Sequence, residues 1–166
     1  TALAPRVAVA GPLLAVSPLP QLDLGDPPVV AVSTPDAARA AVRTILARDP
    51  DLVKILFGDE SPAAVAAFLP VAEAIITEAH ARGVRVAAHA FSLATARLAV
   101  SAGVDVLVHD VIDVPVDDAF VALLRERGVI LMATLVVSDG YQRTFAGPLE
   151  VSARAARFAA PDVIAS

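Results

Sequence analysis

The sequence contains no cysteine. This absence excludes disulfides, thiolate metal ligands and a cysteine nucleophile, and it leaves the compartment open, whether cytoplasmic or exported. A cluster of Lys and Arg is also missing, because the formal net charge of −5 is spread along the chain. A basic surface that would follow a phosphate backbone is therefore not expected, and we predict no nucleic-acid partner.

Long uninterrupted hydrophobic runs are missing as well. Apolar residues make up 57% of the 166 residues, but Pro, Gly, Asp and Arg interrupt them before they reach the ~18 residues of a membrane helix. Ala and Val dominate the apolar set, which is typical of helices packed on buried parallel strands. We therefore predict a soluble α/β protein with no membrane partner, and the length fits one domain spanning residues 1–166.

The first residues, TALAPRVAVAG, carry neither a basic start nor a complete signal-peptide pattern, and no initiator Met precedes them. Signal peptides combine a basic region, an apolar region and a cleavage site. We expect either that a leader was removed or that the chain is a piece of something longer.

A repeated pattern of helix, glycine and β-branched strand organises the chain. It occurs in HARGVRVAAHA, SAGVDVLVHD and RERGVILMATLVV, whose glycines are Gly83, Gly103 and Gly128. Each glycine stands where a helix would end in the left-handed conformation. A fourth copy, ILARDPDLVKILFG, has Asp49-Pro50 in place of the glycine. Strands that alternate with helices predict right-handed crossovers and a parallel sheet.

The same signals predict the individual elements. The predicted strands are 6–10, 29–32, 52–56, 84–88, 104–108 and one beginning at 129. The predicted helices are 37–48, a short turn at 61–62, 70–83, 92–102, 116–127 and 149–159. We expect loops at 11–28, 58–61 and 138–147, and the first of these is long enough to suggest a binding site.

A lysine interrupts one apolar strand, LVKIL, at Lys54. Strands buried on both faces rarely tolerate charge, so this lysine requires an explanation. In one interpretation the strand lies at an edge, or the side chain extends past a neighbour to water. In the other, burial lowers the pKa of the amine, which can then serve as a nucleophile, a base or a carbamate-forming group.

Two of the three histidines directly follow predicted strands. His89 closes VRVAA and His109 closes VDVLV. Because the carboxyl ends of parallel strands meet at one rim, both imidazoles and the far end of the Lys54 strand are expected there. Imidazoles in that position suit zinc or a similar divalent ion, although two core histidines bonded to loop backbone fit the same pattern.

Two other polar residues are interpreted differently. His80 lies in the last turn of a predicted helix, where the helix dipole favours an imidazolium exposed to water, and we predict a structural role. Asp110, next to His109, fits two roles equally well, because its carboxylate can orient a ligand or cap the next loop.

Four strings, in order, resemble the amidohydrolase superfamily, in particular its imidazolonepropionase-like and prolidase-like branch. They are VSTPDAARAAVRTILARDPDLVKI, AHARGVRVAAHA, AGVDVLVHD and RGVILMATLVV. The resemblance extends from about Pro5 to the last predicted helix. It implies parallel β/α units of a TIM (β/α)₈ barrel that is incomplete in this chain, with roughly strands three to seven present.

The resemblance also implies a metal site. In the family, a strand-four lysine carboxylated by carbon dioxide bridges two divalent metals, and histidines of strands five and six bind the second. These ligand and catalytic positions correspond to Lys54, His89 and His109, with zinc, as one or two ions, the expected metal. The family's strand-one His-x-His pair and strand-eight Asp have no counterpart here, and Phe91 stands where members often have a second His.

The function that this resemblance implies is metal-dependent hydrolysis of an amide or related C–N bond, in a dipeptide or cyclic amide, by metal-activated water. Part of the metal site is absent, so we expect the 166 residues alone to be inactive, and missing segments or an oligomer to complete the barrel. Strand-end loops should contact the small-molecule substrate, with Tyr141 and Arg143 as candidates for its carboxylate. Two alternatives remain open, a catalytically inactive binding or assembly module and a Schiff-base lyase that uses Lys54.

Overall fold

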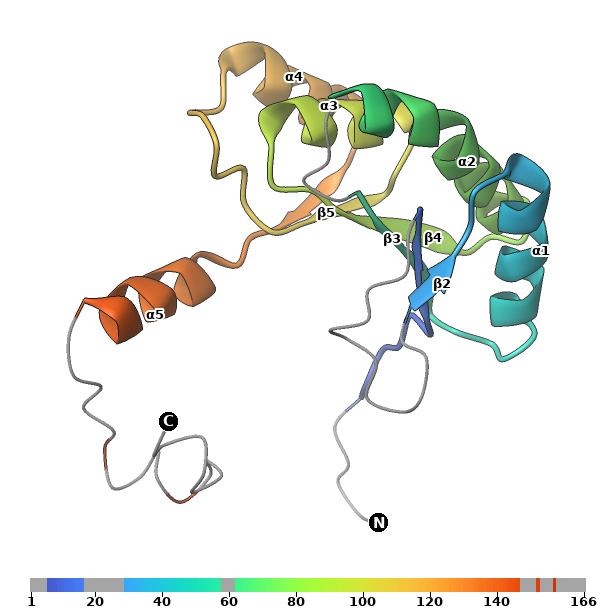
Figure 1. Ribbon diagram of the computed structural model, residues 1–166, viewed down its shortest axis with the longest axis horizontal. Coiled ribbons are helices and arrows are strands. Elements are labelled where there is room, and N and C mark those ends of the chain that lie inside the picture. Colours follow the sequence, from blue (N-terminus) through green and yellow to red (C-terminus); the bar gives the residue numbers. More distant parts are fainter. Residues whose placement is uncertain (1–5, 17–28, 58–61, 147–151, 153–156, 158–166) are drawn as a thin grey trace. The chain divides into compact units, whose positions relative to one another are not determined.

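Six parallel strands form one sheet in the computed structural model, in the order β2-β1-β3-β4-β5-β6 (Figure 1). They are β1 (Leu13–Ala15), β2 (Val29–Ala31), β3 (Leu52–Leu56), β4 (Arg85–His89), β5 (Val106–Val108) and β6 (Ile130–Met132). The structure describes residues 6–16, 29–57, 62–146, 152 and 157. The chain divides into two compact units, Thr1–Ala133 and Thr134–Ser166, and the sheet belongs to the first.

Helices alternate with the strands and lie along one face of the sheet (Figure 1). They are α1 (Pro35–Leu46), α2 (Pro62–His80), α3 (Leu93–Ala102) and α4 (Asp118–Arg127). Right-handed crossovers between neighbouring parallel strands place successive helices on the same side, as in a β/α barrel. The predicted fold class is confirmed: the unit is part of a TIM-barrel-like array, and among its described residues the other face carries no helix.

The strands distribute their side chains between these two faces. Val53, Ile55, Val86, Ala88 and Leu107 are buried in the core beneath the helices. Because side chains alternate along a strand, the residues between them point to the uncovered face. That set includes Leu52, Lys54, Leu56, Ala87, His89 and Val108, and the parallel register sets Lys54 opposite Ala87 and Leu56 opposite His89. Polar side chains on the uncovered face, such as those of Lys54 and His89, therefore lie outside the hydrophobic core beneath the helices.

The helix ends agree with the sequence pattern. Gly103 ends α3 with φ 103° and Gly128 ends α4 with φ 64°. These positive angles suit glycine, which lacks a Cβ that would meet the backbone. In the fourth copy of the pattern Asp49 takes the corresponding conformation, with φ 53°, as aspartate tolerates better than most residues. Three helix starts are capped by Thr34, Ser92 and Asp117 side chains.

The amino-terminal prediction was wrong in its placement of the first strand. Residues 6–10 are not a strand, and β1 lies at Leu13–Ala15, inside the predicted loop 11–28. The reason is pairing, because β1 has hydrogen-bonding neighbours on both sides, in β2 and β3. Val9 is instead bound to Asp51, whose carboxylate accepts its N–H at 2.8 Å. The sheet has six strands, as many as were predicted along the sequence, but the first of them lies at Leu13–Ala15.

A single helix replaces the two segments that we predicted around Pro70. Pro70 lies inside α2, which runs without a break from Pro62 to His80. An internal proline removes one backbone hydrogen bond, but Val71, Ala72 and Ile75 are buried in the core just after it and their packing supports the helix. The stretch Ala63–His80 is long and apolar enough to cross a membrane, yet 44% of it is buried inside the protein, as in a core helix.

The second unit contains α5 (Leu135–Phe145). This helix corrects two predictions, since residues 135–137 do not continue the preceding strand and residues 138–145, which were predicted to lie in a loop, are helical. β5 offers hydrogen-bonding partners only to Ile130–Met132, so the backbone that follows satisfies its polar groups locally in a helix. The predicted loop 58–61, most of loop 11–28 and nearly all of the predicted helix 149–159 lie outside the described residues.

Candidate functional site

Lys54 lies in the middle of the sheet. Its strand, β3, pairs with β1 on one side and β4 on the other, so the interpretation as an edge strand was wrong. Its side chain is on the uncovered face, partly buried, and burial lowers the pKa of the amine to about 8. Desolvation disfavours the charged form, so neutral amine is present in quantity at mildly alkaline pH. Lys54 is also the single lysine of the chain.

His89 and His109 come together at the carboxyl ends of β4 and β5. Val108 is the register partner of His89, so the next residue, His109, lies just beyond that pair. The two ring centroids are 4.5 Å apart with the planes at 75°. Lys54 lies opposite Ala87, two residues before His89 on the same face of the sheet, and its positive charge lowers the pKa of both imidazoles. The three residues predicted from the sequence therefore share one region of the sheet.

Burial and like charges keep the two imidazoles neutral. Burial, then the charges of His109 and Lys54, lower the pKa of His89 to about 4. The pKa of His109 is lowered by burial and by Lys54, and the carboxylate of Asp110 opposes this effect. A neutral imidazole carries one unprotonated nitrogen, the form in which histidine binds metal ions or accepts a proton. Both rings are therefore largely neutral near neutral pH.

The backbone of His109 is unusual. Its φ is 80°, a left-handed conformation that few residues other than glycine adopt. The His109 N–H donates to the carbonyl of Met132 at 3.0 Å, which anchors the residue to the neighbouring strand β6. Such conformations cluster at functional sites, where the surrounding structure maintains them.

Phe91, His89 and His109 form a cluster of three rings, in which Phe91 was not predicted to take part. Its ring centroid is 4.4 Å from that of His89 and 5.1 Å from that of His109. Ala90 between them is buried in the core, so residues 89 and 91 point to the same face of the extended chain. The alternation of side chains along a strand was the signal that could have placed Phe91 beside His89.

Two imidazoles are donors that a divalent metal ion can accept. Two imidazoles on one tetrahedral zinc, with Zn–N bonds of about 2.0–2.1 Å, bring their ring centroids to roughly 5 Å, close to the separation seen here. Within the part of the chain that the structure describes, no group of three or more His, Cys, Asp or Glu could hold a metal ion. Lys54 would have to contribute oxygen donors as a carbamate, or residues elsewhere would have to supply them.

The third histidine has the structural position predicted for it. His80 ends α2, and its Nε2 is 2.8 Å from a carboxylate oxygen of Asp105. The same oxygen accepts the Val86 N–H at 2.7 Å, and the Asp105 N–H donates to the Val86 carbonyl at 2.9 Å. This network lies where β4 and β5 begin, away from the strand ends that carry His89 and His109.

Tyr141 and Arg143 lie on α5 in the second unit. Tyr141 stacks on Phe145 with 6.1 Å between ring centroids, and Arg143 Nε is 3.0 Å from an Asp139 carboxylate oxygen. Both side chains are exposed. Their predicted contact with a substrate carboxylate remains a prediction.

Comparison with solved structures finds prolidase-like and amidohydrolase folds. A structure described as a putative prolidase from Bifidobacterium longum is 30% identical, covers 75% of this chain and has a TM-score of 0.59. An amidohydrolase structure is 25% identical over 78% of the chain, with a TM-score of 0.60. Ochratoxinase from A. niger shares the fold, at 20% identity over 86% of the chain and a TM-score of 0.64. No protein-family model matches the chain, and no curated protein matches its sequence.

The present chain corresponds to a part of each of these structures. It spans 30% of the B. longum structure, 32% of the amidohydrolase and 38% of the ochratoxinase. The order of β/α units and these likenesses confirm the resemblance found in the sequence. The chain is related to the prolidase-like proteins of the amidohydrolase superfamily, and its ancestry is that of a hydrolase.

Proposed function

We propose that the protein containing this chain is a metal-dependent hydrolase of an amide or related C–N bond, for which Lys54, His89 and His109 supply part of the metal site. The observation that carries the proposal is their convergence on the uncovered face of the sheet, at the strand ends. The likeness to a prolidase and an amidohydrolase supports the reaction class.

Each residue has a distinct role in this proposal. His89 and His109 would offer neutral imidazole nitrogens to a divalent cation, since the pKa of each is lowered. Lys54, whose amine has a pKa of about 8, would react with carbon dioxide to form a carbamate, releasing a proton and adding two oxygen donors. A divalent metal such as zinc, when bound, polarises a carbonyl and lowers the pKa of water.

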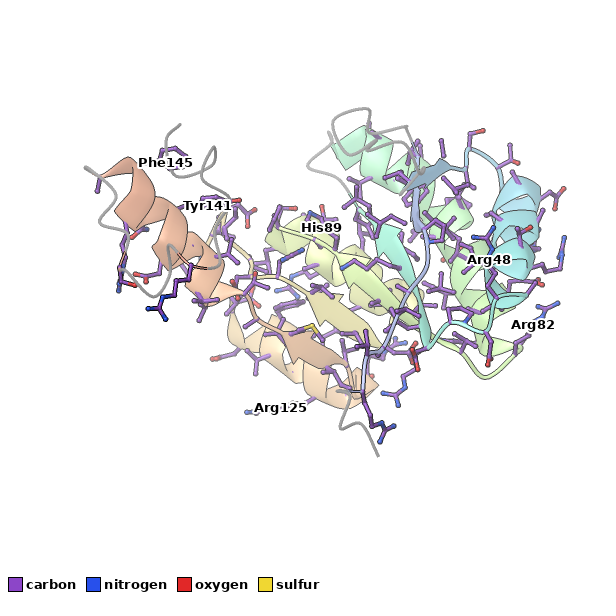
Figure 2. The ribbon with its side chains drawn as sticks, turned by 90° about the horizontal axis from the view of Figure 1, so that it is seen from below. Arg48, Arg82, His89, Arg125, Tyr141 and Phe145 are labelled. Atoms are coloured by element: carbon purple, nitrogen blue, oxygen red, sulfur yellow. The ribbon has the colours of Figure 1, made fainter. Side chains whose placement is uncertain are left out.

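The test is metal content and hydrolysis in the purified protein, measured for Lys54→Met and for a matched control. Arg48→Met is suitable, because Arg48 is also a cation, is exposed, and lies well apart from His89 in Figure 2. We expect Lys54→Met to weaken metal binding by more than about 10-fold and to abolish hydrolysis of dipeptides or cyclic amides, with Arg48→Met unchanged. Unchanged metal content and turnover in Lys54→Met would refute the proposal.

The carbamate has its own test, made easier by the single lysine. With ¹³C-labelled bicarbonate, a carbamate resonance should appear in the wild-type protein and in Arg48→Met, but not in Lys54→Met. A resonance that persists in Lys54→Met belongs to another amine, such as the chain's amino terminus, and would remove Lys54 from this role.

One observation also favours a second candidate, a Schiff-base lyase. An amine with a pKa of about 8 is a competent nucleophile toward a carbonyl carbon. Borohydride would trap such an adduct on Lys54, the one lysine available, and mass spectrometry would locate it. Activity that chelators abolish, with no trapped adduct, favours the hydrolase instead. If neither activity nor metal binding is found, the inactive binding or assembly module remains.

A further inference from the structure

Phe91 occupies a position that its own packing does not explain. It is only partly buried and does not belong to the hydrophobic core, unlike Phe57 and Phe68, which pack edge to face within it at 5.5 Å. Instead its ring contacts the two imidazoles, His89 at 4.4 Å and 73°, His109 at 5.1 Å and 39°. With 4.5 Å between the histidines, every ring of this cluster contacts the other two.

The backbone holds each member of the cluster in place. The His89 carbonyl accepts the Phe57 N–H at 3.1 Å, and the Phe91 carbonyl accepts the Ile112 N–H at 2.9 Å. The residue after Phe91, Ser92, caps α3 by accepting the Thr95 N–H at 3.1 Å. Since the main chain is anchored in this way, the orientation of the imidazoles depends chiefly on side-chain rotation, and a neighbouring ring restricts that rotation.

Phe91 also links two segments at the site, the one between β4 and α3 and the one between β5 and α4. Ile112 belongs to the segment between β5 and α4, and a second bond from the Leu93 N–H to Asp113 at 2.9 Å holds this segment to the start of α3. Phe91 therefore contacts both imidazoles through its side chain and fixes the loop beyond His109 through its carbonyl. Metal ligands need this kind of orientation, because affinity depends on the rings being directed before the ion arrives.

We propose that Phe91 is a positioning residue, which holds the His89 and His109 rings in the mutual orientation that a divalent cation requires. This inference rests on the proposed metal site, since its benefit appears when an ion binds. The proposal predicts that an aromatic ring at position 91 is needed to orient the two imidazoles. An aliphatic side chain of similar volume should not be sufficient.

The experiment compares Phe91→Leu, Phe91→Tyr and Phe68→Leu in the purified protein, with Co²⁺ as the probe. Phe91→Leu should bind Co²⁺ roughly 10-fold more weakly than wild type and change the visible absorption spectrum, which reports coordination geometry. Phe91→Tyr keeps the ring and should restore both. Phe68→Leu makes the same change in an edge-to-face pair of the core, so it should lower the unfolding temperature and leave Co²⁺ affinity and spectrum unchanged.

A second readout separates this inference from the proposed function. The chain has three histidines, and nuclear Overhauser effects between their ring protons can be followed in metal-free protein. The effect between the His89 and His109 rings should weaken in Phe91→Leu and persist in Phe91→Tyr, with the signals of His80, which pairs with Asp105, unchanged. If wild type binds no Co²⁺, the metal site fails, and a weakened effect in Phe91→Leu then supports only the orientation of the two rings by Phe91. An unchanged Overhauser effect between the two imidazoles, or wild-type Co²⁺ affinity and spectrum, in Phe91→Leu would overturn the inference.

Discussion

Replacing Lys54 with Met should stabilise the metal-free protein near neutral pH. The folded protein holds a partly buried ammonium whose pKa burial lowers from 10.5 to about 8. Among the described residues no carboxylate contributes to that shift, so none of them offsets the desolvation of the charge. Met keeps the apolar part of the side chain and removes the charge, which eliminates this cost.

The size of the effect follows from the pKa. A pKa shift of one unit corresponds to about 1.4 kcal/mol of free energy, so the full shift of the Lys54 pKa corresponds to roughly 3 kcal/mol. Because the amine is only partly buried, solvent screening reduces this to roughly 1–2 kcal/mol. Between pH about 8 and 10.5 the unfolded chain binds more protons than the folded protein, so the free energy of unfolding of wild type rises with pH across that window.

Urea unfolding as a function of pH measures this prediction. The free energy of unfolding of Lys54→Met should exceed that of wild type by roughly 1–2 kcal/mol below pH 8, and the difference should vanish as the pH approaches 10.5. Arg48→Met, at an exposed position, should show no such pH-dependent difference. A Lys54→Met protein that is no more stable than wild type at neutral pH, or a gain that is independent of pH, would refute the reasoning. If Lys54→Met is more stable than wild type and also loses metal binding, Lys54 is retained for function at a cost in stability.

The remaining predictions concern the elements that carry the site. Asp105→Ala removes the acceptor of His80 and Val86 and should lower the free energy of unfolding by roughly 1–2 kcal/mol, without changing Co²⁺ binding. Gly128→Ala, at φ 64°, should cost roughly 1 kcal/mol by backbone strain alone, since no atom crowds the new methyl group; an unchanged urea midpoint would contradict this. For Asp117, the Phe120 N–H and then Arg97 lower the carboxyl pKa. Ionised Asp117 therefore stabilises the fold above the ordinary carboxyl range and loses this effect as the pH falls, so the wild-type advantage over Asp117→Ala in thermal unfolding should disappear in acid.

Some of the site could be predicted because the relevant signals are local. A charge within LVKIL, and a histidine at the end of each of two apolar strands, mark Lys54, His89 and His109 without knowledge of the contacts. Parallel strands then require that such ends share one rim. Phe91 was not assigned a role, because alternation along the strand places it only beside His89, whereas its contact with His109 depends on the neighbouring strand.

The sequence by itself determined the alternation of helices and strands, through glycines at left-handed helix ends, capping residues and runs of β-branched side chains. These properties act over a few residues, so they can be read along the chain. Only the tertiary structure decided that β1 lies within 11–28, that α2 continues through Pro70, and that Lys54 is inside the sheet. Each of these depends on partners far away in sequence: the strands on either side of β1, the core against α2, and the neighbours of β3. Hydrogen bonds and packing between distant segments outweigh local preference at those positions.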